Sequence, residues 1–319
     1  MYNVAIYAVL ISFIINLILS PILIPYLSKL KLGQFVRDDG PKSHLKKAGT
    51  PTMGGIIILS STLLTSILFL KDNKDGLAVL LVTLGFGIIG FIDDFIKVAM
   101  KRSLGLKAYQ KIIAQFIISG CFLYYILNIA NIGTSVIIPF SQGKEVNLGI
   151  WFLPFFFIVM LGTVNGVNLT DGLDGLVSSV TVLIATFFTI VSWGENSSIF
   201  PIGAAVVGSL LAFLLFNSYP AKVFMGDTGS LALGGFVVST AFILKMPIFI
   251  AIVGIIYLIE SISVMIQVAY FKATGKRIFK MAPIHHHFEL SGWTESKVVS
   301  VFCIATAVAC LIGLLGLGR

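Results

Sequence analysis

Two adjacent carboxylates, Asp93 and Asp94, end a nearly unbroken apolar run in the segment GIIGFIDDFIKVAMKR, residues 87–102. Ionisable side chains at membrane depth are costly to keep, and as a rule they serve a function. Lys97 follows Asp93 by four residues, so on a helix the two side chains lie on one face and can pair. A solvated helix end is the alternative interpretation of this acidic pair.

Two other segments place aspartates between apolar stretches. The segment NGVNLTDGLDGL, residues 165–176, contains Asp171 and Asp174, whose carboxylates would share a face if they began a helix. The segment NSYPAKVFMGDTGS, residues 217–230, places Asp227 just before a predicted helix. Turn and cap roles are the alternative interpretation, because Asp is common at both positions.

Three consecutive histidines lie in the segment MAPIHHHFELSGWTE, residues 281–295. Adjacent histidine side chains point in different directions, so this spacing does not predict a zinc site.

Together with the aspartates and many lysines, the histidines are typical of a phosphoryl-transfer site. Carboxylate oxygens suit Mg²⁺, which also bridges phosphate groups, and cationic side chains suit the phosphates themselves. The polar residues therefore predict phosphoryl transfer with Mg²⁺ as the cofactor.

The elements that position these residues are predicted to be membrane helices. Of the 319 residues, 57% are hydrophobic and 11% are charged, whereas soluble domains carry about 25% charged residues. A helix needs about 20 apolar residues to cross a bilayer. We therefore predict an all-α, polytopic integral membrane protein with one transmembrane domain over residues 1–319. Its ten predicted transmembrane helices cover residues 3–27, 52–70, 77–96, 111–129, 150–168, 175–193, 199–217, 229–245, 247–271 and 298–317.

The distribution of basic residues predicts the orientation of these helices. The connections after the first, third, fifth, seventh and ninth helices hold 17 of the 22 lysines and arginines. Positive charge marks the cytoplasmic side, so these connections are predicted to be cytoplasmic and both termini extracytoplasmic. The net charge of +8 thus reports topology and not nucleic-acid binding. A β-branched stretch, a turn and a polar stretch within residues 130–149 predict a small extracytoplasmic hairpin.

The polar segments resemble those of the polyprenyl-phosphate N-acetylhexosamine-1-phosphate transferases, over essentially the whole chain. The matching strings, in the family's order, are GTPTMGG at 49–55, DD at 93–94, NLTDGLDGL at 168–176, FMGDTGS at 224–230 and APIHHHFEL at 282–290. The aspartate strings are shared across the superfamily. The GTPTMGG and histidine strings are much more specific to its muramoyl-pentapeptide branch.

This resemblance implies a reaction and its setting. Undecaprenyl phosphate would attack the β-phosphorus of UDP-N-acetylmuramoyl-pentapeptide, giving lipid I and UMP in the first membrane step of peptidoglycan synthesis. The resemblance also implies dependence on Mg²⁺, a homodimer, and an active site on the cytoplasmic face of the bacterial inner membrane. Carboxylates would stay at the membrane edge because a lipid phosphate and a cytoplasmic nucleotide meet there.

The resemblance further assigns roles to residues of this chain. Asp227 would bind the metal, Asp93 and Asp94 would lie beside the metal and the lipid phosphate, and Phe224 would stack on uracil. The expected catalytic residues are Asp93, Asp94, Asp227 and His285. The expected substrate-binding residues are Lys47, Lys97, Lys111, Asn165, Asn168, Asp171, Gly172, Leu173, Asp174, Asn217, Phe224, Gln267, His286 and His287.

Two alternative functions stay open on the sequence. A sister transferase would use UDP-N-acetylglucosamine with the same lipid, and an assay with both nucleotides separates the two. A secondary transporter would carry charges deep within discontinuous helices. In this chain only Glu260 lies deep within a predicted helix, and uptake into liposomes without UMP formation would favour transport.

Overall fold

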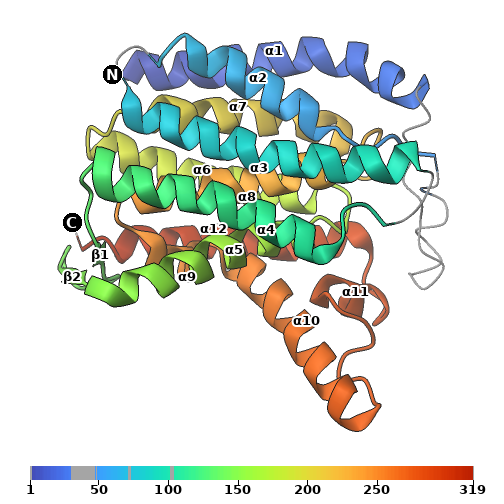
Figure 1. The fold of residues 1–319 in the computed structure, drawn as a ribbon. Coiled ribbons are helices and arrows are strands. Elements are labelled where there is room, and N and C mark those ends of the chain that lie inside the picture. Colours follow the sequence, from blue (N-terminus) through green and yellow to red (C-terminus); the bar gives the residue numbers. More distant parts are fainter. Residues whose placement is uncertain (1, 30–46, 48, 71–72, 101–103, 319) are drawn as a thin grey trace.

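The computed structural model describes residues 2–29, 47, 49–70, 73–100 and 104–318. Most of its helices run nearly parallel or antiparallel to one another in one bundle, which confirms the all-α class (Figure 1). The helices are α1 (Tyr2–Lys29), α2 (Gly55–Ile67), α3 (Lys74–Ala99), α4 (Ala108–Tyr124), α5 (Phe152–Thr170), α6 (Leu176–Gly194), α7 (Phe200–Asn217), α8 (Gly226–Ile243), α9 (Ile250–Val253), α10 (Ile255–Thr274), α11 (Ile284–Glu289) and α12 (Glu295–Leu315). A π-helical turn, Tyr125–Ile129, continues α4.

The membrane spans agree with the expected polytopic protein. Within the described residues, nine helices are long and apolar enough to cross a membrane, and α2 is a shorter apolar helix of 13 residues. Each of these ten segments overlaps one of the ten predicted helices. The two chain ends lie at the same end of the bundle, as an even number of crossings requires (Figure 1).

The centre of the bundle is α8, which is enclosed by α2, α3, α5 and α6. Its residues from Thr228 to Ile243 are all buried. Small residues let neighbouring backbones approach closely inside a membrane. A Cβ atom on Gly90 of α3 would collide with the backbone of Asp227, and one on Gly55 of α2 would collide with Gly229. Glycine at these positions therefore brings α2 and α3 against the first turn of α8.

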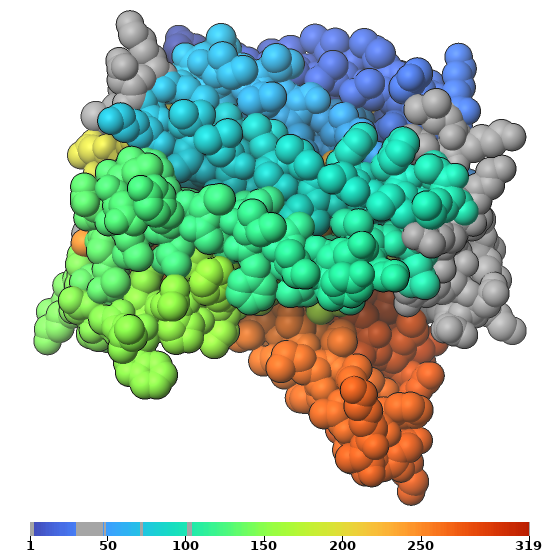
Figure 2. Space-filling model, viewed as in Figure 1, coloured from blue at the N-terminus to red at the C-terminus, as the bar shows by residue number. Residues whose placement is uncertain are grey.

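The ninth predicted helix, residues 247–271, is not continuous. The chain leaves the helical conformation at Gly254, with φ −95° and ψ 25°, between α9 and α10. From there α10 diverges from the bundle, and with the loop that follows it forms a wedge projecting from the body of the molecule (Figures 1 and 2). An unbroken apolar run carries no signal for such a bend, because both halves have lipid-compatible composition.

A two-stranded antiparallel hairpin forms within residues 130–149, which confirms the hairpin and leaves its extracytoplasmic position a prediction. Strand β1 (Ser135–Ile137) pairs with β2 (Glu145–Asn147), and Val136 lies opposite Val146. The backbone N–H of Phe140 in the connecting turn donates to the carbonyl oxygen of Gly316, just beyond α12. The hairpin lies at the end of the bundle where the chain termini lie, opposite the C-terminal end of α3 (Figure 1). Asp93 and Asp94 lie in the last turns of that helix.

Candidate functional site

Three carboxylates meet where α3 ends and α8 begins. Asp93, Asp94 and Asp227 each offer an oxygen atom, and these atoms all lie within 4.8 Å of one another. We call these three residues the acidic cluster. The side chain of Asp227 is 18% exposed, against 5% for Asp93 and 4% for Asp94. Asp227 is therefore the member of the cluster that a ligand reaches most readily.

Two lysines neutralise part of the acidic cluster. The Nζ atom of Lys97 lies 2.6 Å from Asp93 Oδ2, which confirms the expected pairing of these residues. The same ammonium lies 2.9 Å from Asp227 Oδ2, and the Nζ of Lys111 lies 2.9 Å from that oxygen as well. Asn168 donates from Nδ2 to the other Asp227 oxygen at 2.8 Å. The predicted residues Lys97, Lys111 and Asn168 thus converge on Asp227.

The acidic cluster has the donor chemistry of a magnesium site. Three carboxylates against two ammonium groups leave one uncompensated negative charge, and the Asp93 and Asp227 carboxyl groups contact one another. Lys97 lies against both of these carboxyl groups, and the negative charge that remains favours a further cation or a proton. Mg²⁺ prefers oxygen ligands of this kind and usually binds only one or two carboxylates, with water and phosphate in its other positions. The residues therefore fit the expected metal.

Asp94 belongs to α3, but its side chain accepts the first N–H groups of α8, because the N-cap residue Met225 supplies no side-chain hydrogen bond. Its carboxylate accepts hydrogen bonds from the backbone N–H of Asp227 at 3.2 Å, and from the N–H and hydroxyl of Thr228 at 2.9 and 2.7 Å. The alternative reading of Asp227 as its own helix cap is wrong, since Met225 holds the cap position and Asp227 lies in the first turn. Carboxylates suit this place because the first N–H groups of a helix lack partners.

The residues from Asp171 to Asp174 form a turn, so the two carboxylates do not share a helix face. Helix α6 begins only at Leu176. The Asp171 carboxylate accepts a hydrogen bond from the backbone of Gly226, next to the acidic cluster. Burial, and after it the charges of the neighbouring aspartates, raise the pKa of Asp171 to about 8.

Asp174 points to a second group of charges. Its Oδ1 atom lies 2.7 Å from the Nζ of Lys47, and its Oδ2 atom accepts the backbone N–H of Ala221. Glu295, at the start of α12, lies 2.6 Å from the same Nζ and also accepts the backbone N–H of Asp174. We call Lys47, Asp174 and Glu295 the Lys47 cluster. Burial opposes the charge on Lys47, but the hydrogen bonds to Asp174 and Glu295 outweigh it and raise the pKa of Lys47.

The remaining residues expected at the nucleotide site mostly hold backbone segments in place. Asn217 donates to the carbonyl oxygen of Val223, and Leu173 is a core residue. Phe224 is half-buried. Its backbone N–H donates to the carbonyl oxygen of Pro51 and its own carbonyl accepts from Gly54, so the GTPTMGG and FMGDTGS segments lie side by side.

The three histidines do not join the acidic cluster. The Nδ1 atom of His285 lies 3.1 Å from Glu260 Oε2, and both side chains are fully buried. The other ring nitrogen of His285 packs against Gly172, where a Cβ atom would collide with it. His285 therefore supports the Asp171–Asp174 turn from the side of α10, and its expected catalytic role stays a prediction.

His286, His287 and Gln267 organise the region between α10 and α11. His286 Nδ1 lies 2.9 Å from Glu289, His287 accepts the backbone N–H of Lys280, and Gln267 accepts that of Phe279.

Asn165 lies on α5, and its side chain exchanges hydrogen bonds with Gln115 of α4. These contacts give it a structural role and do not bring it to the carboxylates.

Sequence reasoning missed three partners in the site. Glu295 follows Thr294, the N-cap of α12, and so has the pattern of an ordinary acidic first-turn residue. Gln115 lies in an apolar helix, where a single polar residue gives little indication of its partner. Thr228 lies in the FMGDTGS string, but nothing in that string indicates its contact with Asp94 of α3. Glu260 was visible as a charge within an apolar span, but its pairing with His285 depends on the bend at Gly254.

Comparison with known proteins identifies relatives over nearly the full chain. Residues 76–245 match the model of Glycosyl transferase family 4, and residues 47–59 match the phospho-N-acetylmuramoyl-pentapeptide-transferase signature 1. A phospho-N-acetylmuramoyl-pentapeptide-transferase of Clostridium kluyveri is 54% identical over 98% of this chain and 99% of its own length. Enzymes of the same name from Clostridium botulinum and Clostridium novyi are 53% and 51% identical, over 97% and 99% of this chain and 95% and 97% of their own lengths.

Proposed function

Because this chain belongs to the phospho-N-acetylmuramoyl-pentapeptide-transferases of glycosyl transferase family 4, we propose the reaction that it catalyses. It transfers phospho-N-acetylmuramoyl-pentapeptide from UDP-N-acetylmuramoyl-pentapeptide to undecaprenyl phosphate, giving lipid I and UMP. The observation that carries this proposal is the convergence of Lys97, Lys111 and Asn168 on Asp227 within a buried acidic cluster. Phosphoryl transfer needs such positioned charges more than it needs covalent chemistry.

The lysines and carboxylates have separable roles in the proposal. Asp227, the most exposed member of the acidic cluster, would hold Mg²⁺, with Asp93 beside it. Bound Mg²⁺ would neutralise charge on the pyrophosphate and orient it. Lys97 and Lys111 are placed to turn from Asp227 toward the phosphate oxygens when substrate binds. Asp94 would act by fixing the first turn of α8, since its oxygens are taken by Asp227 and Thr228.

The nucleotide would bind between the two clusters. Asp174 and Lys47 offer a carboxylate and an ammonium group. Phe224 offers a half-buried ring in the segment whose Ala221 donates its backbone N–H to Asp174. The turn of residues 171–174 connects this place to the acidic cluster through the contact of Asp171 with Gly226. A uridine diphosphate bound along this turn would bring its phosphates toward Asp227.

The chemical step is proposed to be a single displacement. A phosphate oxygen of the lipid forms a bond to the β-phosphorus, while the bond from that phosphorus to the oxygen bridging the two phosphates breaks. The electron pair leaves with UMP. A phosphate monoester has a second pKa near 6, so most of the acceptor is already a dianion, and Asp93 takes the remaining proton. A covalent phosphoryl-aspartate is the alternative, and it adds a second displacement.

A burst experiment separates these two mechanisms. Enzyme rigorously freed of lipid is mixed with the nucleotide substrate and Mg²⁺, and UMP is measured in the first turnover. We expect no stoichiometric UMP without the lipid phosphate. One UMP per active site, with sugar-phosphate trapped on Asp93 or Asp94 by mass spectrometry, would establish the covalent route.

UMP release tests the proposed function itself. We expect release from UDP-N-acetylmuramoyl-pentapeptide that requires both undecaprenyl phosphate and Mg²⁺, with far less from UDP-N-acetylglucosamine. The reverse preference would favour the sister transferase. The proposal also includes a site on the cytoplasmic face of the bacterial inner membrane. It further includes a homodimer, which crosslinking in native membranes tests.

A further inference from the structure

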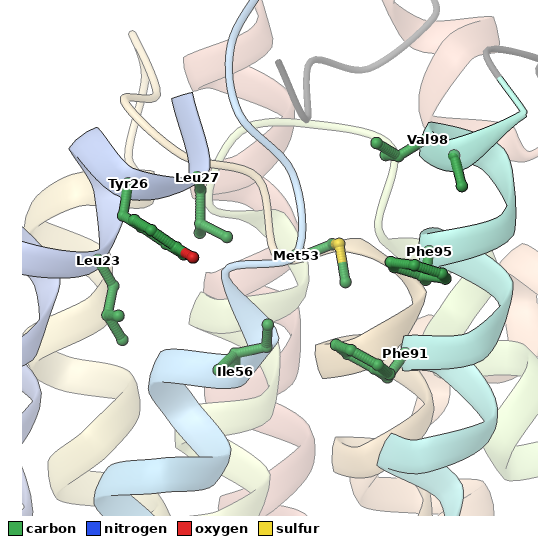
Figure 3. A pocket seen from close by; sticks show the side chains of 9 residues that line it. Leu23, Tyr26, Leu27, Met53, Ile56, Phe91, Phe95 and Val98 are labelled. Atoms are coloured by element: carbon green, nitrogen blue, oxygen red, sulfur yellow. The ribbon is translucent and has the colours of Figure 1, made fainter. Parts of the chain in front are cut away.

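An apolar cavity and a buried charged pair take no part in the proposed chemistry. The cavity, of about 450 Å³, lies between α1, α2 and α3, and Met53 and the side chains of α3 face one another across it (Figure 3). The pair is Glu260 of α10 and His285 of α11, whose side chains are 0% and 1% exposed. Apolar walls are ordinary in a membrane protein, but a buried ionisable group is costly to keep and as a rule serves a function.

Glu260 and His285 depend on one another for their positions. The Oε2 atom of Glu260 lies 3.1 Å from the Nδ1 atom of His285, and among the described residues this imidazole is the one basic group that pairs with Glu260. Within the same part of the chain, neither side chain has a hydrogen bond of ordinary geometry. The ring is therefore placed by its attraction to the carboxylate and by the space around it.

The space for the ring comes from Gly172. A Cβ atom on this glycine would collide with the Nε2 atom of His285 and would lie 2.6 Å from its Cε1 atom. The φ angle of Gly172 is outside the left-handed region, so the backbone itself does not require glycine there. Glycine is needed at this position because the imidazole ring approaches the backbone so closely.

Gly172 lies within the turn that links the acidic cluster to the Lys47 cluster. On one side of it, the Asp171 carboxylate accepts a hydrogen bond from the backbone of Gly226, next to the acidic cluster. On the other side, the Asp174 carboxylate lies 2.7 Å from the Nζ of Lys47. A shift of the backbone at Gly172 would therefore move both carboxylates relative to the two clusters.

Helix α10 also supports the two helices that this turn connects. A Cβ atom on Gly166 of α5 would lie 2.9 Å from the hydroxyl of Ser261, so α5 and α10 are in close contact. The hydroxyl of Tyr257 shares a hydrogen bond of 2.6 Å with Thr181 of α6. Helix α10 thus contacts α5 and α6 directly, and it reaches the turn between them through Glu260 and the ring of His285.

We propose that Glu260 is a positioning residue for nucleotide binding. Through His285 it fixes Gly172, and with it the turn of residues 171–174, without itself touching the nucleotide. The inference rests on the proposed function, in which a uridine diphosphate binds along this turn. Without the carboxylate the imidazole ring moves away from Gly172 and the turn loses its support. The acidic cluster belongs to α3 and α8, so the lipid phosphate keeps its site.

Two replacements of Glu260 separate positioning from stability. Glu260→Met fills the same space with an apolar side chain, and since His285 can lose its proton, no unpaired charge stays buried. We expect an undiminished melting temperature and UMP binding that is about tenfold weaker by calorimetry, since the loss of one polar contact changes a binding equilibrium by about this factor. Glu260→Gln keeps an oxygen atom near the ring and is expected to lose less affinity.

The KM values provide a second measurement on the same variants. Glu260→Met is expected to raise the KM for the nucleotide substrate about as much as it weakens UMP binding. The KM for undecaprenyl phosphate is expected to stay unchanged. An equal rise in both KM values, or unchanged UMP affinity and nucleotide KM, would overturn the proposal.

Tyr257→Phe is the matched control, because it removes another buried polar contact of α10 that does not reach the turn. We expect its UMP affinity to equal that of the wild type. UMP binding that is weakened as much by Tyr257→Phe as by Glu260→Met would show a general loosening of α10 and would overturn the proposal.

A double-mutant cycle tests whether Glu260 and Gly172 act through one ring. Gly172→Ala forces a Cβ atom against His285, and we expect it to weaken UMP binding about tenfold. In Glu260→Met the ring is free to move away from that atom. The double variant is therefore expected to lose much less affinity than the product of the two single effects. Effects that multiply fully, to about 100-fold, would show that the two residues act independently and would overturn the proposal.

The outcome for the proposed reaction is distinguishable from the outcome for Glu260. Wild-type protein that binds UMP and releases it from the nucleotide substrate, with Glu260→Met indistinguishable from it, leaves the reaction standing and removes the role of Glu260. If UMP binding responds to the variants as expected but no UMP forms from either nucleotide substrate, the proposed reaction fails while the positioning role stands.

Discussion

Asp93, Asp94 and Asp227 carry the same functional group and differ in what surrounds it. Asp94 accepts hydrogen bonds from the N–H groups of α8 and lies 3.7 Å from Lys97, whereas Asp93 and Asp227 lie 2.6 and 2.9 Å from lysine ammonium groups. Asp94 therefore stabilises the start of α8, whereas Asp93 and Asp227 are available to a ligand. Exposure separates Asp227 from the other two, because its side chain is 18% exposed and those of Asp93 and Asp94 are 5% and 4% exposed.

At Asp227 the metal hypothesis gives a definite prediction. We expect Asp227→Asn to fold normally and to lose turnover by about 100-fold or more. Replacing a residue that only hydrogen-bonds to a metal ligand already lowers metal affinity or activity about 10–100-fold. An amide still accepts the hydrogen bond from Asn168 but binds Mg²⁺ poorly. UMP release across a Mg²⁺ titration measures the effect. Near-normal activity with an unchanged Mg²⁺ requirement would move the metal elsewhere.

The raised pKa of Asp171, about 8, predicts a pH dependence of stability. In an unfolded chain the pKa is about 3.9, so between roughly pH 4 and 8 the folded protein holds a proton that the unfolded chain has lost. Stability therefore falls as pH rises through this window. Asp171→Asn removes that loss, and we expect it to raise the melting temperature by several degrees at pH 8 and much less at pH 5.

Thermal unfolding in detergent with EDTA provides the measurement for Asp171. The chelator keeps divalent cations from stabilising the ionised carboxylate. A melting-temperature difference between variant and wild type that is equal at both pH values would contradict the assignment.

At the scale of elements, the site depends on α8 being approached closely by its neighbours. Gly55 and Gly90 remove the side chains that would keep α2 and α3 away, and Asp94 then reaches across to the open N–H groups. The bend at Gly254 has a similar effect on the other side. It lets Glu260 of α10 meet His285 of α11 beneath the Asp171–Asp174 turn.

The cap formed by Asp94 predicts a graded effect on stability. Loss of a helix cap costs about 0.5–2 kcal/mol, and Asn caps nearly as well as Asp. We therefore expect Asp94→Ala to lower the melting temperature clearly and Asp94→Asn to lower it little. Circular dichroism of purified protein during heating compares the two. Equal melting temperatures for Asp94→Ala and wild type would show that α8 does not need this partner.

At the scale of the whole molecule, the two ends of the bundle differ in kind. One end holds the last turns of α3, with Asp93 and Asp94, and the other holds the hairpin and the chain termini (Figure 1). With most basic residues in the connections at the first end, the positive-inside rule predicts that this end is cytoplasmic.

Labelling of introduced cysteines measures the orientation. In a variant whose native Cys121, Cys303 and Cys310 are replaced by Ala, the exposed positions Lys144 and Lys276 are changed singly to Cys. An impermeant maleimide added to intact spheroplasts is expected to label Lys144→Cys, in the hairpin. It is expected to label Lys276→Cys, beyond α10, only after permeabilisation. The opposite pattern would invert the topology and place the site outside.

The sequence alone determined the class of the protein, the positions of its membrane segments and the residues that define its family. These properties follow from composition, from apolar length and from short strings, all of which are local along the chain. The sequence also predicted that Asp93, Asp94 and Asp227 form one group. All three lie at the ends of predicted helices, on the side of the membrane that carries most lysines and arginines.

Only the tertiary structure decided which partner each polar side chain has. Asp94 caps a helix 133 residues away in sequence, Lys47 meets Glu295 across 248 residues, and His285 turns to Glu260 and Gly172 instead of the acidic cluster. No local pattern encodes such pairings, because they depend on how closely helices approach and where one bends. The cavity beside α3 has the same origin: its walls are ordinary apolar residues, and only the spacing of α1, α2 and α3 makes a space between them.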